Sequence, residues 1–349
     1  MEQFSCSTQI ISGSGVVSVL KDRHLGRVLI VTDPFFYQNG TAQSLVEGTV
    51  EFFHEVKPDP DLELAAKGTA LVQSFRPDTV IALGGGSAMD CAKAMVYFSR
   101  TAATLIAIPT TSGSGSEVTD FAILTHNGVK HPLIDASLRP KIAIIDSDLV
   151  RKLPPALIAD GGFDALSHSM EAFVATNAGS FSDALSASSF RTVLQHLLNS
   201  YHGDTVARAS VHTAATMAGL SFTQAGLGLC HALSHSLGGR YHLPHGRLNA
   251  ILLPAVMVAN NVPKYALLAR LAGLEGQSDT IAARNLRTTL IRLRKALGLP
   301  ATLNQAGVAI SQDMESIIAD TLADPCCQTN PVPVTPSLVR QVLKEVAGG

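Results

Sequence analysis

Four histidines stand close together in the second half of the chain, at His231, His235, His242 and His245, although the whole sequence contains only 12. His231 and His235 are four positions apart and would share one face of a helix. Gly238-Gly239 predicts the end of that helix, and Pro244 predicts a turn before His245. Imidazole is both a common ligand of transition metals and the usual proton carrier near neutral pH. The spacing therefore predicts a helix, a break and a return that direct several imidazoles to one place.

A second pair of residues with metal-binding side chains occurs earlier, in GGFDALSHSMEA. Asp164 and His168 are four positions apart on an expected helix, so both can bind one ion. A lone histidine is more often a polar residue packed between helices. Together with His231 and His245, however, the pair completes a set of one carboxylate and three imidazoles, which favours a metal site. This set suits Fe(II), Zn(II), Mn(II) or Co(II) and does not select among them.

Two loops rich in glycine and hydroxyl residues follow apolar runs in the first half, LGGGSAMD and PTTSGSGSE. Glycine lets a backbone approach a phosphate closely, and Ser87 with Asp90 could cap the helix that follows. The first loop alone fits a capped turn equally well. The second loop favours a pyrophosphate held from two sides. Asp33, at the end of an earlier apolar run, could bind a ribose and favour NAD over NADP.

Short apolar runs alternate with helical spacing up to about residue 150, which predicts a parallel, Rossmann-like sheet. The sequence after Pro154-Pro155 favours helices throughout. We therefore expect an α/β dinucleotide-binding domain over residues 1–152 and an all-helical metal- and substrate-binding domain over residues 153–349. The expected strands are 27–33, 79–87, 104–112 and 141–149. The expected helices include 62–75, 90–99, 156–175, 180–199, 205–219 and 264–297, and a loop is expected at 325–336 before a last helix.

Composition excludes several classes of protein. The net charge of −2 gives no basic face for nucleic acid. No apolar run has the length of a membrane span, and the first residues do not have the pattern of a signal peptide. The 5 cysteines are scattered and odd in number, which indicates reduced thiols in a cytoplasmic setting rather than a disulfide framework.

Four motifs of the sequence together resemble those of a known family. GGGSAMDCAKA, PTTSGSGSEVT, GFDALSHSMEA and CHALSHSLGGRYHLPHGRLNAILLP together are similar to the iron-containing (group III) alcohol dehydrogenases, above all to those of propanediol- and ethanolamine-utilisation operons. The resemblance implies the dehydroquinate synthase-like fold of that family. It implies Fe(II), with Zn(II) as the alternative, on Asp164, His168, His231 and His245, and a proton-carrying His235. It implies NAD(H) contacts at Asp33, Gly85, Gly86, Ser87, Asp90, Thr110, Thr111, Thr119, Lys130 and Leu149.

The expected function is an NAD(H)-linked interconversion of short primary alcohols and aldehydes, such as propanal and 1-propanol or acetaldehyde and ethanol, mainly as aldehyde reduction. Two alternatives stay open. One is a metal- and NAD-dependent cyclase of the dehydroquinate synthase type, and the other is a non-catalytic cargo protein of a bacterial microcompartment. We expect a small-molecule substrate, a homo-oligomer in the cytoplasm, and an association with microcompartment shell or cargo proteins as an open possibility.

Overall fold

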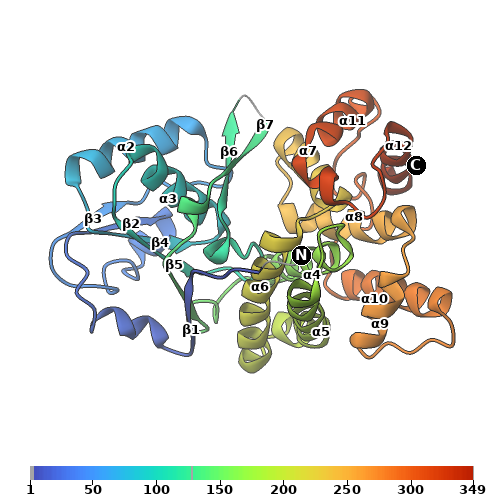
Figure 1. Cartoon of the computed structure of the whole chain (residues 1–349), viewed down its shortest axis with the longest axis horizontal. Helices are drawn as coiled ribbons and strands as arrows, with labels where there is room; N and C mark the ends of the chain where they lie inside the picture. Colours follow the sequence, from blue (N-terminus) through green and yellow to red (C-terminus); the bar gives the residue numbers. More distant parts are fainter. Residues whose placement is uncertain (1–3, 127–128, 349) are drawn as a thin grey trace. The chain divides into compact units, whose positions relative to one another are not determined.

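The structure is a computed structural model that describes residues 4–126 and 129–348 (Figure 1). It consists of two compact units. One unit is Ser5–Leu153, and the other is the chain from Pro154 onward together with Phe4. Phe4 belongs to the second unit because its ring stacks on that of Phe181, with 5.4 Å between the ring centroids.

The first unit is built on a parallel sheet. Among the described residues this sheet has six strands in the order β1-β8-β5-β4-β2-β3, and every pair is parallel. The four expected strands are confirmed, and β1 and β3 extend the sheet at its two edges. The strands are β1 (Gln9–Gly13), β2 (Val28–Thr32), β3 (Val50–Phe53), β4 (Thr79–Gly84), β5 (Thr104–Pro109) and β8 (Ile142–Asp146).

Helices and a separate antiparallel hairpin complete this unit. The hairpin pairs β6 (Phe121–His126) with β7 (Val129–Ile134). The helices are η1 (Val16–Leu20), α1 (Pro34–Gln38), α2 (Leu62–Phe75), α3 (Gly86–Ser99), η2 (Ser116–Val118) and η3 (Ala136–Leu138).

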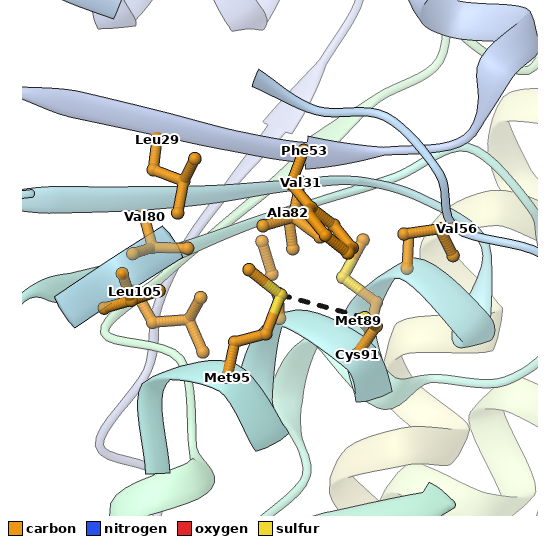
Figure 2. Close-up of a cluster of buried hydrophobic side chains, with 14 of the residues drawn as sticks. Leu29, Val31, Phe53, Val56, Val80, Ala82, Met89, Cys91, Met95 and Leu105 are labelled. Atoms are coloured by element: carbon orange, nitrogen blue, oxygen red, sulfur yellow. Dashed lines mark hydrogen bonds between the residues drawn. The ribbon is translucent and has the colours of Figure 1, made fainter. Parts of the chain in front are cut away.

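The two faces of the parallel sheet have separate cores, because successive side chains of a strand point to opposite faces. On one face, side chains such as Leu29, Val80 and Leu105 pack with α2 and α3. Figure 2 shows Met89, Cys91 and Met95 of α3 within this cluster. On the other face, Ile30, Ile81, Ile106 and their neighbours pack with η1 and with the segment 42–46. This sheet is therefore buried on both faces, as continuous apolar strands require.

The second unit is helical. Helix α4 is its centre: its residues from Phe163 to Val174 are all buried, and it contacts α5, α6 and α8. The elements are α4 (Pro155–Val174), α5 (Ser180–Tyr201), α6 (Thr205–Ala225), α7 (Leu229–Tyr241), α8 (His245–Asn260), α9 (Lys264–Leu271), α10 (Asp279–Ala296), α11 (Met314–Ala323), η4 (Pro325–Thr329) and α12 (Pro336–Ala347) (Figure 1).

One expected helix of this unit is divided. The prediction of a single helix over 264–297 is wrong, because α9 ends at Leu271 and α10 begins at Asp279. Gly273 lies in the connection with φ of 82°, a backbone conformation that favours glycine. Ser278 then caps α10 by accepting a hydrogen bond from the N–H of Ile281. Over the described residues, no helix combines the length and the apolar character that a membrane crossing needs.

Candidate functional site

A cluster of potential metal ligands lies on three helices of the second unit. Asp164 and His168 project from α4, His231 from α7, and His245 is the first residue of α8. Oδ1 of Asp164 lies 3.9 Å from Nδ1 of His168 and 3.9 Å from Nε2 of His231. The same oxygen lies 3.6 Å from Nε2 of His245. Ligand atoms of a tetrahedral ion with bonds of about 2.1 Å lie roughly 3.4 Å apart, so each of the three distances from Asp164 suits a pair of ligands that share one cation. The mutually close group consists of Asp164, His168 and His231, and His245 approaches it through Asp164.

The cluster is mostly buried. Asp164, His168 and His231 have candidate ligand atoms that all lie within 4.8 Å of one another. The ring of His168 stacks against those of Phe222 and His231, each at 4.4 Å between centroids. His245 is more open, with 26% of its side chain exposed. A carboxylate and imidazoles are hard-to-borderline ligands, so the set fits a divalent transition metal such as iron.

The connection between α7 and α8 differs from the prediction. Helix α7 continues through Gly238-Gly239, so the expected break at these glycines is wrong. Both are buried, and packing around them outweighs their low helix propensity. The helix ends instead at Tyr241, and His242, with φ of 54°, is its C-cap. Pro244 then precedes the first residue of α8, as expected, and returns the chain at His245.

Gly246 makes this return possible. A Cβ atom on Gly246 would lie 1.9 Å from the carbonyl oxygen of Asp160 in α4. The start of α8 therefore touches the backbone of α4, which brings His245 to Asp164. The neighbouring Arg247 forms an ion pair of 3.0 Å with Asp160. Burial raises the pKa of Asp160, and the guanidinium of Arg247 opposes this shift.

Two further buried residues contact the ligand set, and the sequence analysis missed both. Oε2 of Glu171 lies 2.6 Å from Nδ1 of His231. Nδ2 of Asn249 donates to Oδ1 of Asp164 at 2.8 Å. Helical spacing was the available signal, because Glu171 follows His168 by three residues and Asn249 follows His245 by four.

His235 lies beside the ligand set. Its ring stacks on that of His245, with 5.2 Å between centroids and 15° between planes. Nδ1 of His235 lies 2.8 Å from Oδ2 of Asp324. Burial raises the pKa of Asp324, but the hydrogen bond and charge of His235 and the hydrogen bonds of Cys326 together outweigh it, and the net shift of the pKa is downward. Neither helical spacing nor a motif predicts Asp324, which belongs to a connection far along the chain.

His235, Asp324 and Cys326 form a second group whose candidate ligand atoms are mutually close. Hydrogen bonds account for this arrangement. One oxygen of Asp324 pairs with His235, and the other accepts from the N–H of Cys326 at 2.8 Å. Burial raises the pKa of the Cys326 thiol well above its ordinary value, so this sulfur is a neutral packing group.

In the first unit, several expected dinucleotide contacts come together at the carboxyl ends of β2, β4 and β5. Gly84 pairs in register with Pro109. The N–H of Thr110 donates to the carbonyl of Gly84 at 2.9 Å. A Cβ on Gly85 would lie 3.1 Å from Thr111. A side chain at this position would be crowded, and because glycine has none, a large anion can approach the backbone of the loop more closely.

Asp33 and Ser87 lie at the starts of two helices. The carboxylate of Asp33 caps α1 by accepting from the N–H of Phe36 at 3.1 Å. The expectation that Ser87 caps α3 together with Asp90 is wrong. Helix α3 begins at Gly86 with Gly85 as its N-cap, so Ser87 lies within its first turn. The amides of that turn still face outward from the helix end and suit a phosphate.

The remaining predicted cofactor residues have partners inside the protein. Asp90 accepts from the hydroxyl of Ser116 and from the N–H of Ile123, and burial raises its pKa. Thr119 is fully buried, and Lys130 lies 2.7 Å from Asp59. Leu149 packs with the η1 side of the sheet. These four side chains thus support the framework around the loops, whereas Asp33, Gly85, Gly86, Ser87, Thr110 and Thr111 lie at the strand ends.

A buried lysine, Lys93 of helix α3, holds the loop that follows β5. Nζ of Lys93 donates to the hydroxyls of Ser116 and Thr119, at 3.0 and 2.8 Å, and to the carbonyl of Phe121. Burial lowers its pKa to about 8, although nearby carboxylates, chiefly Asp90, oppose the shift. Lys93 therefore holds the loop after β5 against helix α3.

Comparisons with known proteins place the chain in a family. Residues 7–147 match the profile of iron-containing alcohol dehydrogenases, and residues 158–347 match that of the Fe-containing alcohol dehydrogenase family, C-terminal. The chain is 39% identical to a 1-propanol dehydrogenase of Citrobacter freundii, over 99% of this chain and all of that protein. It is 33% identical to an NADPH-dependent butanol dehydrogenase of Clostridium saccharobutylicum, over 95% of this chain and 94% of that protein.

The fold agrees with these matches. The structure of an iron-containing alcohol dehydrogenase from Thermococcus thioreducens has a TM-score of 0.91 and 32% identity, covering 99% of each chain. The chain therefore belongs to the iron-containing alcohol dehydrogenase family. It is an NAD(H)-linked alcohol dehydrogenase, an enzyme that interconverts alcohols and aldehydes, and its family implies iron and NAD(H) as cofactors.

Proposed function

We propose that this enzyme chiefly reduces short aldehydes, such as propanal or acetaldehyde, to primary alcohols with NADH, at an iron site formed by Asp164, His168, His231 and His245. The observation that carries the ligand assignment is the position of Asp164. Its Oδ1 atom lies within 3.6 to 3.9 Å of one nitrogen from each of the three imidazoles. The name of the Citrobacter relative supports the choice of substrate.

The bound ion would supply Lewis-acid polarisation of the carbonyl or hydroxyl oxygen. The chain's own residues would hold that ion and keep the ligands desolvated. His168 is fixed between two rings, and His231 and Asp164 are each held by a hydrogen-bonded neighbour. Such fixed ligands favour one geometry of the reacting oxygen.

His235 would carry the proton that the reaction consumes or releases. The carboxylate of Asp324 accepts the Nδ1 hydrogen of His235, which leaves Nε2 as the atom that exchanges a proton. We assign Asp324 as a positioning residue for His235. The stacking of His235 on His245 supports a place beside the reacting groups.

The dinucleotide would bind through Asp33, Gly85, Gly86, Ser87, Thr110 and Thr111 at the strand ends, with Asp90, Thr119, Lys130 and Leu149 completing the predicted set. The carboxylate of Asp33 favours a free ribose hydroxyl, hence NAD over NADP. In this proposal residues 1–152 serve the dinucleotide, and residues 153–349 serve the metal and the substrate.

Fe(II) is the proposed native ion, with Zn(II) as an alternative that the same ligands accept. We further propose a cytoplasmic homo-oligomer, and the resemblance to the alcohol dehydrogenases of propanediol-utilisation operons supports a role in propanediol use inside a microcompartment.

The test is anaerobic purification, metal analysis, and a panel of C2 to C4 aldehydes with NADH and NADPH. We expect one iron per chain and the highest kcat/KM for propanal with NADH. Full activity of a metal-free preparation would overturn the proposal.

A further inference from the structure

One buried carboxylate organises the start of helix α7. Glu171 lies on α4, and only 4% of its side chain is exposed. Oε2 accepts from the N–H of Gly228 at 3.0 Å and from the N–H of His231 at 3.3 Å. Oε1 accepts from the N–H of Cys230 at 2.7 Å. Three backbone donors at the start of α7 thus point at one side chain.

The same carboxylate also contacts a predicted metal ligand. Oε2 lies 2.6 Å from Nδ1 of His231. Both oxygens of Glu171 already accept hydrogen bonds from backbone N–H groups, so the carboxylate acts as an acceptor on each side. Nδ1 of His231 must therefore carry the hydrogen, and Nε2 keeps its lone pair. Nε2 is the atom that lies 3.9 Å from Oδ1 of Asp164.

We propose that Glu171 is a positioning residue of the metal site, and that it fixes both the tautomer of His231 and the place of its ring. This inference rests on the proposed ligand set. A carboxylate behind a metal-bound imidazole orients the ring and raises its basicity. Here the carboxylate also accepts hydrogen bonds from otherwise unpaired donors at the helix start, so one side chain positions both the ring and the first turn of α7.

If Glu171 had only a structural role, it would do no more than cap helix α7. Asn330, which caps the same turn, provides a control for that role. Oδ1 of Asn330 accepts from the N–H of Leu229 at 3.0 Å, in the same turn of α7. No hydrogen bond joins Asn330 to an imidazole among the described contacts. Replacing Asn330 removes a cap from the same turn and leaves the contact to His231 in place.

The experiment compares Glu171→Gln with Asn330→Ala in the full-length protein. Gln keeps the size of the side chain but replaces one carboxylate oxygen by an amide N–H₂ group. That group would face a hydrogen-bond donor of α7 or His231 and could not accept its hydrogen bond. The readouts are the Kd for Fe(II) and Zn(II), from competition with a chelator, and the Tm of the metal-free protein. We expect a 10- to 100-fold weaker Kd for Glu171→Gln and less than about a 3-fold change for Asn330→Ala. Equal affinities for Glu171→Gln and the wild type would overturn the role of Glu171, as would equal losses in both variants.

A second measurement needs no variant and applies if Glu171→Gln does not fold. Nitrogen-15 NMR of histidine in the metal-free wild type, above neutral pH, reports which ring nitrogen carries hydrogen. We expect the Nδ1–H form at His231, with a strongly hydrogen-bonded proton, assigned by its absence in His231→Ala. An Nε2–H form at His231 would refute the proposal.

The His231→Ala variant distinguishes an error in the proposed ligand set from an error in the role of Glu171. If His231→Ala binds Fe(II) as tightly as the wild type, His231 is not a ligand, and the proposed site fails together with the role of Glu171. If His231→Ala loses the metal while Glu171→Gln keeps wild-type affinity, only the inference about Glu171 fails.

Discussion

Nε2 of His245 lies 3.6 Å from Oδ1 of Asp164. This contact joins the first residue of α8 to the middle of α4, two helices that are far apart in the sequence. His245 is the most open member of the ligand set, whereas His231 is almost fully buried, with 1% of its side chain exposed. The two histidines should therefore differ in how strongly the site depends on them.

Replacement of His231 by Ala should remove metal and activity together. The change deletes one ligand and leaves Glu171 buried without its imidazole partner. We expect metal affinity and kcat/KM to fall by at least about 100-fold. Metal analysis and the rate of NADH consumption with propanal measure both quantities. Wild-type activity in a preparation without metal would contradict the assignment.

Gly246→Ala should damage the site through the backbone. The new Cβ would lie 1.9 Å from the carbonyl oxygen of Asp160, so α8 has to move away from α4. We expect a loss of about 1–3 kcal/mol in the free energy of unfolding, as overpacking usually costs, and a lower metal content. Val258→Ala, on an exposed part of the same helix, should change stability by less than about 0.5 kcal/mol. Unchanged stability and metal content in Gly246→Ala would show that the close contact between the start of α8 and the backbone of α4 is not needed for the site.

Asp324 can be tested without loss of its capping role. Asp324→Ser keeps an acceptor for the N–H of Cys326 but is too short to reach His235. We expect kcat to fall about 10-fold or more, since a misplaced proton carrier loses part of a contribution of roughly 100-fold. Metal content should stay at the wild-type level. An unchanged kcat would remove Asp324 from the proposal.

Much of the fold could be predicted from sequence because buried parallel strands and amphipathic helices carry strong patterns. Strands β2, β4, β5 and β8 are continuous apolar runs, and helix α2 has the predicted bounds. Strand β1 was missed because it lies at the edge of the sheet and is largely exposed, so it lacks an apolar run. The break expected at Gly238-Gly239 was wrong because local propensity does not report burial.

The predicted ligands came from helical spacing and resemblance, and these identify residues on one turn or in one motif. Asp324 pairs with His235 across a long stretch of chain, and no spacing rule connects them. Glu171 and Asn249 lie at helical spacing from predicted ligands, but their direction depends on how α4, α7 and α8 pack. That packing is a tertiary property, so the residues behind the ligands were not predicted.

Asp33→Gly should relax the preference for NAD over NADP. The change removes a carboxylate that would repel the 2′-phosphate of NADP. The cap of α1 is also lost, but a glycine cap costs only a few tenths of a kcal/mol. We expect the ratio of kcat/KM for NADH to that for NADPH to fall about 10-fold or more. Asp61→Gly is the matched control, because Asp61 caps α2 in the same way through the N–H of Leu64, and it should leave the ratio unchanged. An equal shift in both variants would refute the role of Asp33.

Lys93 should make stability depend on alkaline pH. Burial lowers its pKa from 10.5 to about 8 in the folded state, against the effect of nearby carboxylates such as Asp90. Between about pH 8 and 10.5 the unfolded chain binds the extra proton, so this residue makes stability rise with pH in that window. Below it the lysine is charged in both states, and its contribution is constant.

The measurement is urea unfolding of the wild type and Lys93→Met at several pH values. Burial raises the pKa of the buried cysteines and tyrosines, which therefore ionise in this range only in the unfolded chain. The difference between the two proteins cancels their contributions. We expect the wild type to gain up to about 1.4 kcal/mol per pH unit relative to the variant across the window. A pH-independent difference would mean that Lys93 keeps an ordinary pKa.

The division of the proposed metal ligands between α4 and the α7–α8 pair has a consequence for biosynthesis. During translation Asp164 and His168 leave the ribosome well before His231 and His245, and the early pair alone offers too few donors for tight binding. The complete site forms only when the chain has emerged beyond α8 and these helices have packed. Iron insertion should therefore follow the folding of the helical unit, and cells starved of iron should accumulate folded protein that accepts the metal later.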